Sequence, residues 1–520
     1  MRQSVNDLIT QEEIAQWFPD KPVLIPAQTG QGKTYWVSHG LYDYLKARNL
    51  TCLFLIQRTR TKEQLKKEFA GKEVTIHVET YQSIEQNILR KNPTPHYDFI
   101  VCDEAQYFTS DAGFNEYTDI SFDWIFEQRN SVKIFMSATL KSFLYRLMNK
   151  QRGNIFLYIN GKLQPLDMFA CTPAKLNLTT PYDYSHIKSL TFFHEKEQLE
   201  KIAAQVISSN RKAVFFIQST ERALELYRKF KNNMVFSCSK GNLEYKKYMN
   251  ETLIDSIADN CTFDSAILVT TAALDSGFTL KDSAINTIVV DMMEPETVIQ
   301  CVGRKRPINN DDKIDLYIRG RTNEEVNRSL QQMVQDIKSA KLFFENEEEY
   351  HISNHRQNSA NNVIYNRPIG YDDNGNLQYV KSPNYSKIAR LEYYAYNLFP
   401  SITKAKIKFG YDKYLARHFG FFDDESKQYT YKVLSSKRQT LIEYLDSIIG
   451  VKMFTPKDRK PLIDKIGLKD YKGKLQKNLI TLNTYLQDEN LPYTIVSRRE
   501  TKTVDGAKKN YTAVWTLLKA

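Results

Sequence analysis

The chain has 520 residues, of which 42% are hydrophobic and 12% aromatic, and its formal net charge is +11. This length predicts about three or four domains. No apolar run approaches the roughly 18–20 residues that cross a bilayer, and the polar N-terminus, with Glu12 and Glu13, lacks the basic-then-apolar pattern of a signal peptide. The sequence therefore predicts no membrane-spanning helix, and we expect a cytoplasmic protein.

Cysteine spacing and charge distribution further limit the classes of protein to which this chain could belong. The six cysteines include no Cys-x-x-Cys pair, so we expect neither a zinc site nor a disulfide framework. Residues 456–520 hold 14 Lys and Arg against 7 Asp and Glu, a net +7 that is more than half of the total excess. A basic excess of this kind favours a polyanionic partner.

Residues 1–148 alternate short apolar runs with helix-like stretches such as Tyr35–Lys46, Thr61–Phe69 and Tyr81–Leu89. Strand–helix alternation with continuously apolar strands is typical of an α/β domain whose parallel sheet is covered on both faces. The predicted strands are Val23–Ala27, Cys52–Ile56, Val74–Val78, Phe99–Cys102 and Lys133–Met136.

A second α/β domain is predicted over residues 188–322. Residues 149–187, rich in Pro, Thr and Tyr, are expected to form an irregular connector before it. The predicted strands of the second domain are Val214–Ile217, Met234–Phe236, Ala266–Val269, Thr287–Val290 and Leu316–Ile318.

The remainder of the chain changes in composition. Residues 323–455 are predicted to form a mostly helical accessory region, with a helix over Glu324–Phe344 and a hairpin turn at Asp373–Gly375. Residues 456–520 follow the order helix, turn, helix, hairpin, which predicts a basic module resembling a winged helix. The aromatic residues spaced along the accessory helices could stack on bases, but they are expected to be mainly core: Tyr393, Tyr394, Tyr396, Phe399, Phe409, Tyr411, Tyr414, Phe419, Phe421 and Phe422.

The run Ala27–Thr34 (AQTGQGKT) follows a predicted strand and precedes a helix, which is the context of a phosphate-binding loop. Glycines let successive backbone N–H groups point at an anion, and the helix N-terminus adds its dipole. Lys33 is expected to contact the β- and γ-phosphates of ATP, and the Thr34 hydroxyl to bind Mg²⁺. The predicted ATP-binding residues of this loop are Thr29, Gly30, Gln31, Gly32, Lys33 and Thr34.

The run His96–Gln106 (HYDFIVCDEAQ) ends an apolar strand in two adjacent carboxylates. Asp103 is expected to hold Mg²⁺ through water. Glu104 is expected to polarise the attacking water as a general base.

These two runs match a known family. Asp103–Gln106 resembles the acidic box of superfamily-two (DEAD/DEAH-box-like) helicases in a variant that ends in Gln, and further runs resemble the other motifs of that family in the expected order. They are Phe54–Arg60, Glu79–Ile84, Ser137–Thr139, Phe215–Thr220, Val269–Gly277 and Gln300–Arg306. The resemblance covers about the first 320 residues and implies two tandem RecA-like domains.

The resemblance also assigns roles to residues. It implies a catalytic set of Glu104, Gln106, Arg304 and Arg306, with both arginines supplied by the second domain; Pro307 stands where the family usually has its final Arg, so which arginine lies nearer the γ-phosphate stays open. Asp275 and Gly277 would contact ATP, and Ser137, Thr139 and Gln300 would couple hydrolysis to movement. The implied nucleic-acid contacts are Arg58, Thr59, Thr80, Gln82, Ser219, Thr220, Thr270 and Thr271.

We therefore expect an ATP- and Mg²⁺-dependent helicase or translocase. The winged-helix-like module favours DNA over RNA as the track. A nucleic-acid-sensing ATPase that does not unwind, or an RNA helicase, is the alternative. Gln11 is available for adenine recognition but could equally be a surface residue, and an origin in a phage or mobile element would suit the composition.

Overall fold

The computed structural model describes the chain except residues 1–3, 29, 58, 114, 151–153, 160–161, 168–182, 240–241, 272–278, 355–362, 405–409, 422–431, 435, 469–474, 490, 505–506 and 520. Side chains at 59–61, 63–64, 154–159, 162–167, 404, 432–440, 504 and 507 also lie outside the described part. The chain forms two compact units, one of residues 1–190 and 203–430 and another of residues 191–202 and 431–520.

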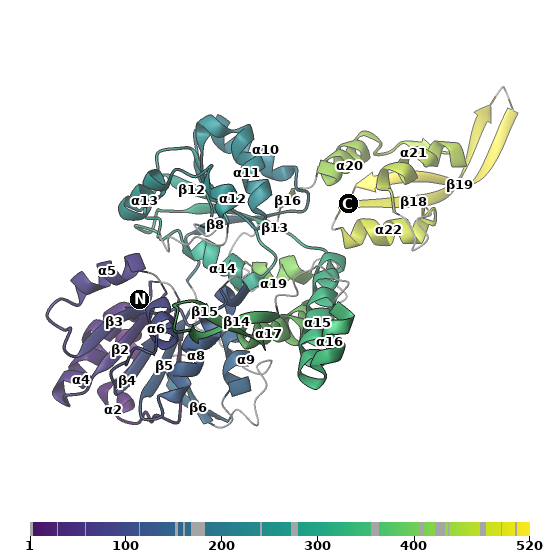
Figure 1. Cartoon of the computed structure of the whole chain (residues 1–520). Helices are drawn as coiled ribbons and strands as arrows, with labels where there is room; N and C mark the ends of the chain where they lie inside the picture. Colours follow the sequence, from purple (N-terminus) through teal and green to yellow (C-terminus); the bar gives the residue numbers. More distant parts are fainter. Residues whose placement is uncertain are drawn as a thin grey trace. The chain divides into compact units, whose positions relative to one another are not determined.

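The first unit begins with a seven-stranded sheet of strand order β3-β2-β4-β5-β1-β6-β7 (Figure 1). Its first five strands pair in parallel, so their carboxyl ends lie along one edge. The strands are β1 (Val23–Pro26), β2 (Cys52–Ile56), β3 (Ile76–Thr80), β4 (Phe99–Cys102), β5 (Val132–Ser137), β6 (Asn154–Ile159) and β7 (Lys162–Asp167).

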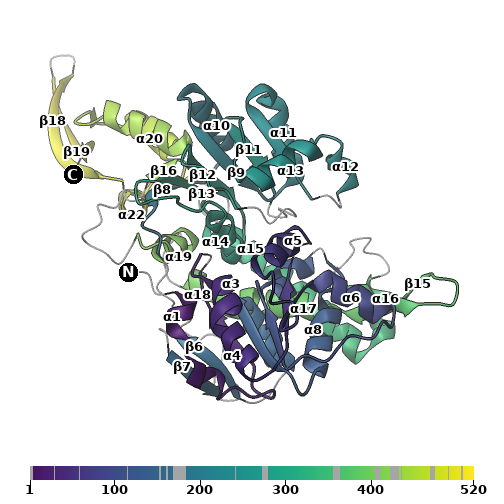
Figure 2. The same cartoon turned by 90° about the vertical axis from the view of Figure 1, so that its left-hand side faces the viewer.

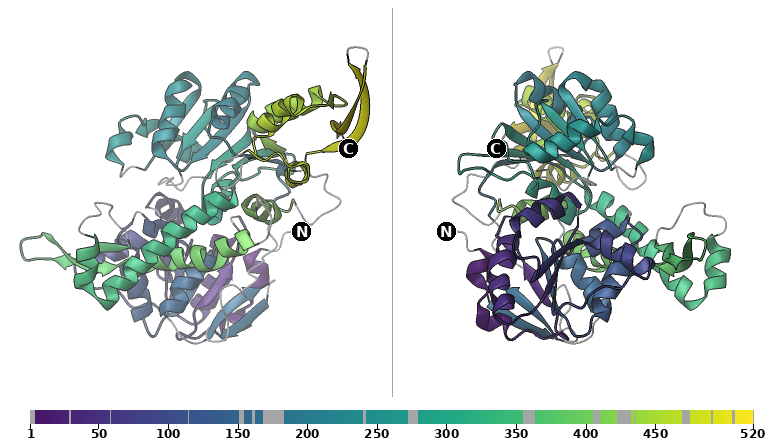
Figure 3. Two further views of the ribbon diagram at one scale, coloured as in Figure 1. Left: turned by 90° about the vertical axis from the view of Figure 1, so that its right-hand side faces the viewer. Right: turned by 60° about the vertical axis from the view of Figure 1, so that its left-hand side comes forward.

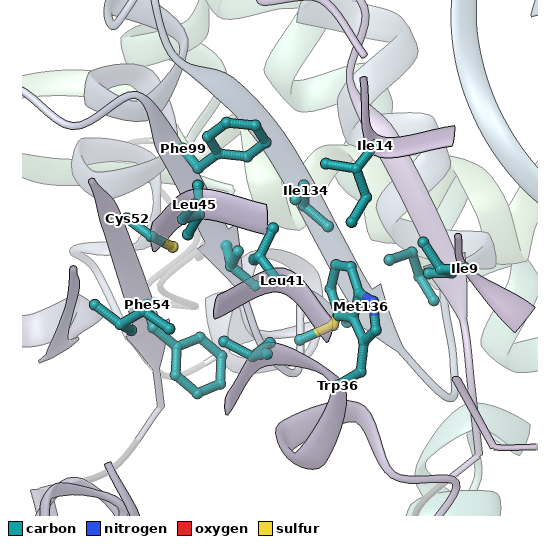
Figure 4. Packing of buried hydrophobic residues seen from close by; sticks show 14 of the residues in the cluster. Ile9, Ile14, Trp36, Leu41, Leu45, Cys52, Phe54, Phe99, Ile134 and Met136 are labelled. Carbon is teal, nitrogen blue, oxygen red and sulfur yellow. The ribbon is translucent and has the colours of Figure 1, made fainter. Parts of the chain in front are cut away.

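Alternate residues of these strands enter two separate cores, which explains why the strands read as continuous apolar runs. On one face, Ile134 and Met136 pack with Trp36 and Leu41 (Figure 4). On the other face, Leu24 and Phe135 pack with the second set of helices. The first face is covered by α1 (Val5–Leu8), α2 (Gln11–Ile14), α3 (Lys33–Trp36), a π-helical turn (Val37–Leu41), α4 (Tyr42–Ala47) and α5 (Thr59–Glu68); the second by α6 (Tyr81–Leu89), α7 (Tyr107–Ser110), α8 (Thr118–Glu127) and α9 (Lys141–Lys150).

Two expectations for this sheet need correction. The segment 149–187, expected to be irregular, contains β6, which pairs in parallel with β1, and β7, which pairs antiparallel with β6. The apolar run of β6 was obscured by the Pro- and Thr-rich composition around it. The third strand was also predicted two residues too early, because Val74 is 94% exposed in a turn and the strand begins at Ile76.

A second parallel sheet follows, with the order β10-β11-β9-β12-β13 and β8 (Ile187–Phe193) beside β13. The five predicted strands are present, each within two residues of its expected bounds. The prediction of two tandem RecA-like parallel-sheet domains is thereby confirmed. The elements are β9 (Lys212–Ile217), β10 (Met234–Ser237), β11 (Ile267–Thr270), β12 (Ile285–Asp291), β13 (Ile314–Arg319), α10 (Gln198–Ser208), α11 (Thr220–Lys229), α12 (Leu243–Lys246), α13 (Glu251–Asn260) and α14 (Pro295–Gly303).

The accessory region after the second sheet is mostly helical, as predicted. A capping box at Thr322 begins its longest helix, α15 (Asn323–Glu345), drawn in teal-green in Figure 3. The predicted hairpin is formed by β14 (Ile364–Tyr371) and β15 (Leu377–Pro383), of which β15 is labelled in Figure 2, and β14 packs against α6. The other elements are α16 (Glu347–Asn354), α17 (Tyr385–Glu392), a π-helical turn (Tyr393–Leu398), α18 (Phe399–Lys404) and α19 (Gly410–His418).

The aromatic residues of these helices are mainly core, as expected. Tyr393, Tyr394 and Tyr411 are at most 2% exposed, whereas Tyr396 is 52% exposed. Phe409 and Phe422 lie outside the described residues.

The second unit holds the predicted helix–turn–helix–hairpin order, preceded by one more helix and two short strands. Three of its strands pair antiparallel in the order β17-β19-β18, and its core also contains Leu441 and Leu445 of α20. In Figure 1 the far end of the β18–β19 hairpin extends beyond the helices of this unit. The elements are β16 (Lys432–Leu434), α20 (Ser436–Ser447), β17 (Lys452–Met453), α21 (Pro456–Ile466), α22 (Leu479–Asp488), β18 (Tyr493–Val504) and β19 (Ala507–Lys519).

Across the described residues, the helices are all too short or too polar to span a bilayer.

Candidate active site

The phosphate loop connects the carboxyl end of β1 to the first turn of α3. Gly30 and Gly32 have φ angles of +85° and +76°, a region that side chains other than glycine rarely adopt. Gly32 is the N-cap of α3, so the loop ends at a helix N-terminus, where backbone N–H groups and the helix dipole favour an anion. Thr29 lies outside the described residues.

Lys33 places a cation between this loop and the acidic strand. The side chain is buried, its Nζ donates to the Ala27 carbonyl at 3.2 Å, and it lies 3.8 Å from Oε1 of Glu104. Gln31 stabilises the loop from within, because its Oε1 accepts from the Gln28 N–H at 2.5 Å. The loop is thus held in shape by its own side chains.

The acidic box continues β4 at the carboxyl edge of the sheet. Asp103 N–H donates to the Leu55 carbonyl of β2 at 2.9 Å, and Ala105 N–H donates to the Met136 carbonyl of β5 at 2.9 Å. Between these anchors, Glu104 has a φ angle of +50°, a left-handed conformation that is costly for a residue with a side chain. The backbone here is held on both sides while it turns the second carboxylate.

The two carboxylates differ in their electrostatics. Burial, together with the charge of Glu104, raises the pKa of Asp103, and its buried Oδ1 has no hydrogen-bond partner among the described residues. Burial would also raise the pKa of Glu104, but Lys33, a hydrogen bond from Gln106 and the charges of Arg304 and Arg306 bring it below its ordinary value. Glu104 is therefore ionised at neutral pH, as a general base must be.

The residues present fit a magnesium ion bound with ATP. The unpartnered buried oxygen of Asp103 is a hard carboxylate donor, and Thr34, a residue with a hydroxyl group, lines the same cavity. Mg²⁺ prefers one or two such protein ligands and takes its remaining ligands from phosphate and water.

Glu104 is linked to the second domain through a chain of hydrogen bonds. Gln106 Nε2 donates to Glu104 Oε2 at 2.6 Å, and the Ser137 hydroxyl donates to Gln106 Oε1. Ser137 Oγ in turn accepts from Thr139 N–H at 2.9 Å. Finally, Gln300 Nε2 on α14 donates to Thr139 Oγ1 at 3.1 Å. The three predicted coupling residues thus form one continuous chain with the acidic box.

Arg304 and Arg306 follow α14 on a segment held by Leu280. Leu280 N–H donates to the Arg304 carbonyl at 2.8 Å, and Arg306 N–H donates to the Leu280 carbonyl at 2.9 Å. Lys305 between them forms a buried ion pair with Asp312 at 2.5 Å. Burial lowers the pKa of Arg306, and its Nε is buried without a hydrogen-bond partner among the described residues. A buried guanidinium with an unused donor is suited to an incoming anion.

A single cavity of about 750 Å³ joins these features. It is lined from the first domain by Gly30, Thr34, Asp103, Glu104 and Gln106, and from the second domain by Gln300, Arg304 and Arg306. Sequence reasoning missed further lining residues, because they lie in loops with no motif spacing: Asp183, Tyr184, His186, Lys281, Asn309 and Lys313. Asp183 is fixed to the phosphate loop, since its N–H donates to Gln28 Oε1 at 3.1 Å and its carbonyl accepts from Gln28 Nε2 at 3.4 Å.

Those predicted nucleic-acid contacts that the structure describes do not line this cavity. Thr80 at the end of β3 caps α6, where it accepts from Ser83 N–H at 3.1 Å, and Gln82 in the first turn of α6 is exposed. In the second domain, Ser219 caps α11, Thr220 begins that helix, and Thr270 and Thr271 are buried at the end of β11. All follow carboxyl ends of parallel strands, so each group occupies one edge of its sheet.

The remaining predicted site residues are either undescribed or lie away from the cavity. Arg58, Asp275, Gly277 and the side chain of Thr59 lie outside the described residues. Gln11 is exposed, and its amide donates to the Gly40 carbonyl in the π-helical turn at 2.7 Å.

Comparisons with known proteins do not assign a function to this chain, so the functional proposal rests on the residues of the site. Models of protein families give no match to this chain, and neither do curated proteins. Among solved structures, S. cerevisiae Dbp5 bound to RNA and ADP–BeF3 is 16% identical over 59% of this chain and 82% of that chain, with a TM-score of 0.41. Mss116p with its NTE and C-tail deleted, bound to ssRNA and AMP-PNP, is 15% identical over 65% and 80%, with a TM-score of 0.38. The DEAD-box helicase Mss116 bound to ssRNA and UDP-BeF is 15% identical over 60% and 69%, with a TM-score of 0.41. These values are too low to carry a functional conclusion.

Proposed function

We propose that this protein is an ATP-dependent motor on nucleic acid, a helicase or translocase of the superfamily-two type. The observation that supports this proposal most strongly is the composition of the cavity. A Gly-Lys-Thr loop and two carboxylates from one RecA-like domain face two arginines from the other domain. A simple phosphate-loop kinase would leave the second domain and its arginines without a role.

Each part of the cavity has a chemical task. The loop N–H groups and Lys33 would bind the phosphates, and Thr34 and Asp103 would hold Mg²⁺, which would supply positive charge beside the phosphates. Glu104 is fixed by Gln106 and accepts a proton from the attacking water. Arg304 and Arg306 place positive charge where the γ-phosphate transfer builds negative charge, and a rigid guanidinium suits that purpose.

Because the arginines and Gln300 belong to the second domain, phosphate binding draws the two domains together, and loss of the γ-phosphate releases them. The hydrogen-bond chain from Glu104 to Gln300 ties the position of the base to this closure. Contacts at the carboxyl edges of both sheets would then alternate between tight and loose. That alternation is how such a motor steps along a strand.

The track is proposed to be DNA on the strength of the second unit. The proposal that this unit is a winged helix is supported by its order α20–β17–α21–α22–β18–β19, in which a helix–turn–helix precedes a β-hairpin, and by its sheet order β17-β19-β18. Lys502 lies directly opposite Lys509 on the hairpin, and both are exposed. Like charges directly opposite one another destabilise a hairpin, whereas a phosphate backbone between them would neutralise both.

The experiment that tests the proposal is steady-state ATP hydrolysis by the full chain and its Glu104→Gln variant. Each is measured alone and with single-stranded DNA, duplex DNA or single-stranded RNA. Stimulation by one polymer that is lost in Glu104→Gln supports the motor and identifies its track. Stimulation without strand separation in an unwinding assay favours the sensing ATPase, and stimulation by RNA alone favours the RNA helicase. A Glu104-dependent rate that no nucleic acid changes would refute the nucleic-acid motor.

A further inference from the structure

Helix α14, which immediately precedes Arg304, is held at three points along its length, two of them by the first domain and one by the accessory region. Gln300 donates to Thr139, as described above. One turn closer to its N-terminus, Glu296 Oε1 accepts from Ser142 N–H of α9 at 3.3 Å. At its N-cap, Glu294 forms an ion pair with Arg390. From Glu294 to Arg304 the helix spans about 15 Å, so the three contacts fix its direction as well as its position.

Arg390 differs from the other two partners because it comes from accessory helix α17. Its side chain is 16% exposed, and one guanidinium nitrogen donates to the Ser110 carbonyl at 2.8 Å while the other pairs with Glu294. Ser110 ends α7, four residues after Gln106 of the acidic box. One planar guanidinium thus bridges the end of the acidic-box segment and the start of the arginine-bearing helix. A lysine could not make both contacts with the same geometry.

Helix α17 is itself fastened to the first domain. Asp119 of α8, 1% exposed, accepts from the N–H groups of Tyr385 and Ser386 at 2.9 and 3.0 Å. Asn384 Nδ2 donates to the Ala112 carbonyl at 3.2 Å. Arg390 therefore acts as part of the first-domain surface, although it follows the whole second domain in the sequence.

We propose that Arg390 is a positioning residue for catalysis, which sets α14 so that Arg304 and Arg306 enter the cavity. This inference rests on the proposed ATPase function. It makes the accessory region a required third partner in the closure of the two RecA-like domains. An event that shifts α17 would then change the rate of hydrolysis without touching ATP.

The test compares the wild type with Arg390→Met and Arg390→Lys, using nucleic-acid-stimulated ATP hydrolysis by the full chain. Arg390→Met is expected to lower kcat at least about tenfold, equivalent to ~1.4 kcal/mol. KM for ATP should change by less than about twofold, because the phosphate loop is intact. Arg390→Lys, which retains the charge but not the fork, should recover part of kcat. The matched control is Arg367→Met, since Arg367 also comes from the accessory region but, among the described residues, forms its ion pair with Asp123 of the first domain, at 3.0 Å, and not with α14.

A second measurement does not need hydrolysis. Fluorescent labels are placed as unnatural amino acids at Val74 and Leu243, which are 94% and 80% exposed in the two domains. Energy transfer with AMP-PNP and Mg²⁺ should report fewer closed molecules for Arg390→Met than for the wild type or Arg367→Met. An unchanged kcat in a normally folded Arg390→Met variant, or an equal loss in Arg367→Met, overturns the inference. If the wild type hydrolyses no ATP, the proposed function fails, and an unchanged closed fraction in Arg390→Met would overturn this inference separately.

Discussion

Replacing Asp119 with Ala should detach accessory helix α17 from the first domain. The Asp119 carboxylate accepts from two N–H groups of the first turn of α17, from the Ser386 hydroxyl at 2.5 Å, and from Arg146 at 3.1 Å. Removing one partner of a buried ion pair costs about 3–5 kcal/mol. Arg146 keeps Asp123 at 3.6 Å as a weaker partner, which places the expected loss near the lower bound, at about 3 kcal/mol.

Native-state hydrogen exchange measures this loss locally, where global unfolding of a multidomain chain would not be two-state. The amides of α17 should exchange about 100-fold faster in Asp119→Ala, as 3 kcal/mol implies. Asp123→Ala is the control, because its side chain is 22% exposed and its pairs are partly solvated, so about 1 kcal/mol or less is expected. A loss under about 1 kcal/mol for Asp119→Ala would refute the view that this carboxylate anchors α17.

Three further predictions test the site, the second unit and the core. Thr139→Val removes the hydroxyl that accepts from Gln300. The loss of this hydrogen bond, worth about 0.5–1.5 kcal/mol, should lower the stimulated kcat roughly 2- to 10-fold. The control Thr403→Val, which loses a hydrogen bond within its own helix, should have no effect on kcat. Replacing Lys502, Lys508 and Lys509 by Gln should make the dependence of log Kd for duplex DNA on log salt shallower by about 2–3, whereas the same change at Lys46, Lys91 and Lys229 should leave the slope unchanged. Burial raises the pKa of Glu85 from 4.5 to about 7, so the folded chain retains a proton that the unfolded chain releases between these values. The stability that Glu85 contributes is complete below pH 4.5 and declines by about 3 kcal/mol as the pH rises to 7. In Glu85→Gln the denaturation midpoint should depend less on pH over this range. A pH profile equal to that of the wild type would contradict the reasoning.

The sequence predicts those parts of the molecule that depend on local pattern. Five strands of each sheet were found because buried parallel strands are continuous apolar runs between helices, and Cys52–Ile56 and Phe99–Cys102 agree with the structure residue for residue. The phosphate loop and acidic box were found because their chemistry requires fixed residue types at strand ends. The hairpin turn at Asp373–Gly375 was found from its turn residues.

What the sequence did not predict depends on contacts between distant segments. Arg390 and Glu294 are 96 residues apart, and no spacing rule connects an arginine in an accessory helix with a helix N-cap in another domain. The strand β6 was missed because its pairing with β1 is decided by the sheet edge rather than by its neighbours in sequence. Cavity residues such as Asp183 and Lys313 lie in loops, where position follows from the ends of other elements.

The left-handed backbone of Glu104 has a consequence for evolution and engineering. A residue with a side chain in this conformation costs roughly 1 kcal/mol or more, which glycine would avoid and asparagine would reduce. Selection for thermal stability alone would therefore favour replacing the very residue that the chemistry needs. The protein stands at a local trade-off between stability and activity, and a library screened only for melting temperature should accumulate inactive variants at this position.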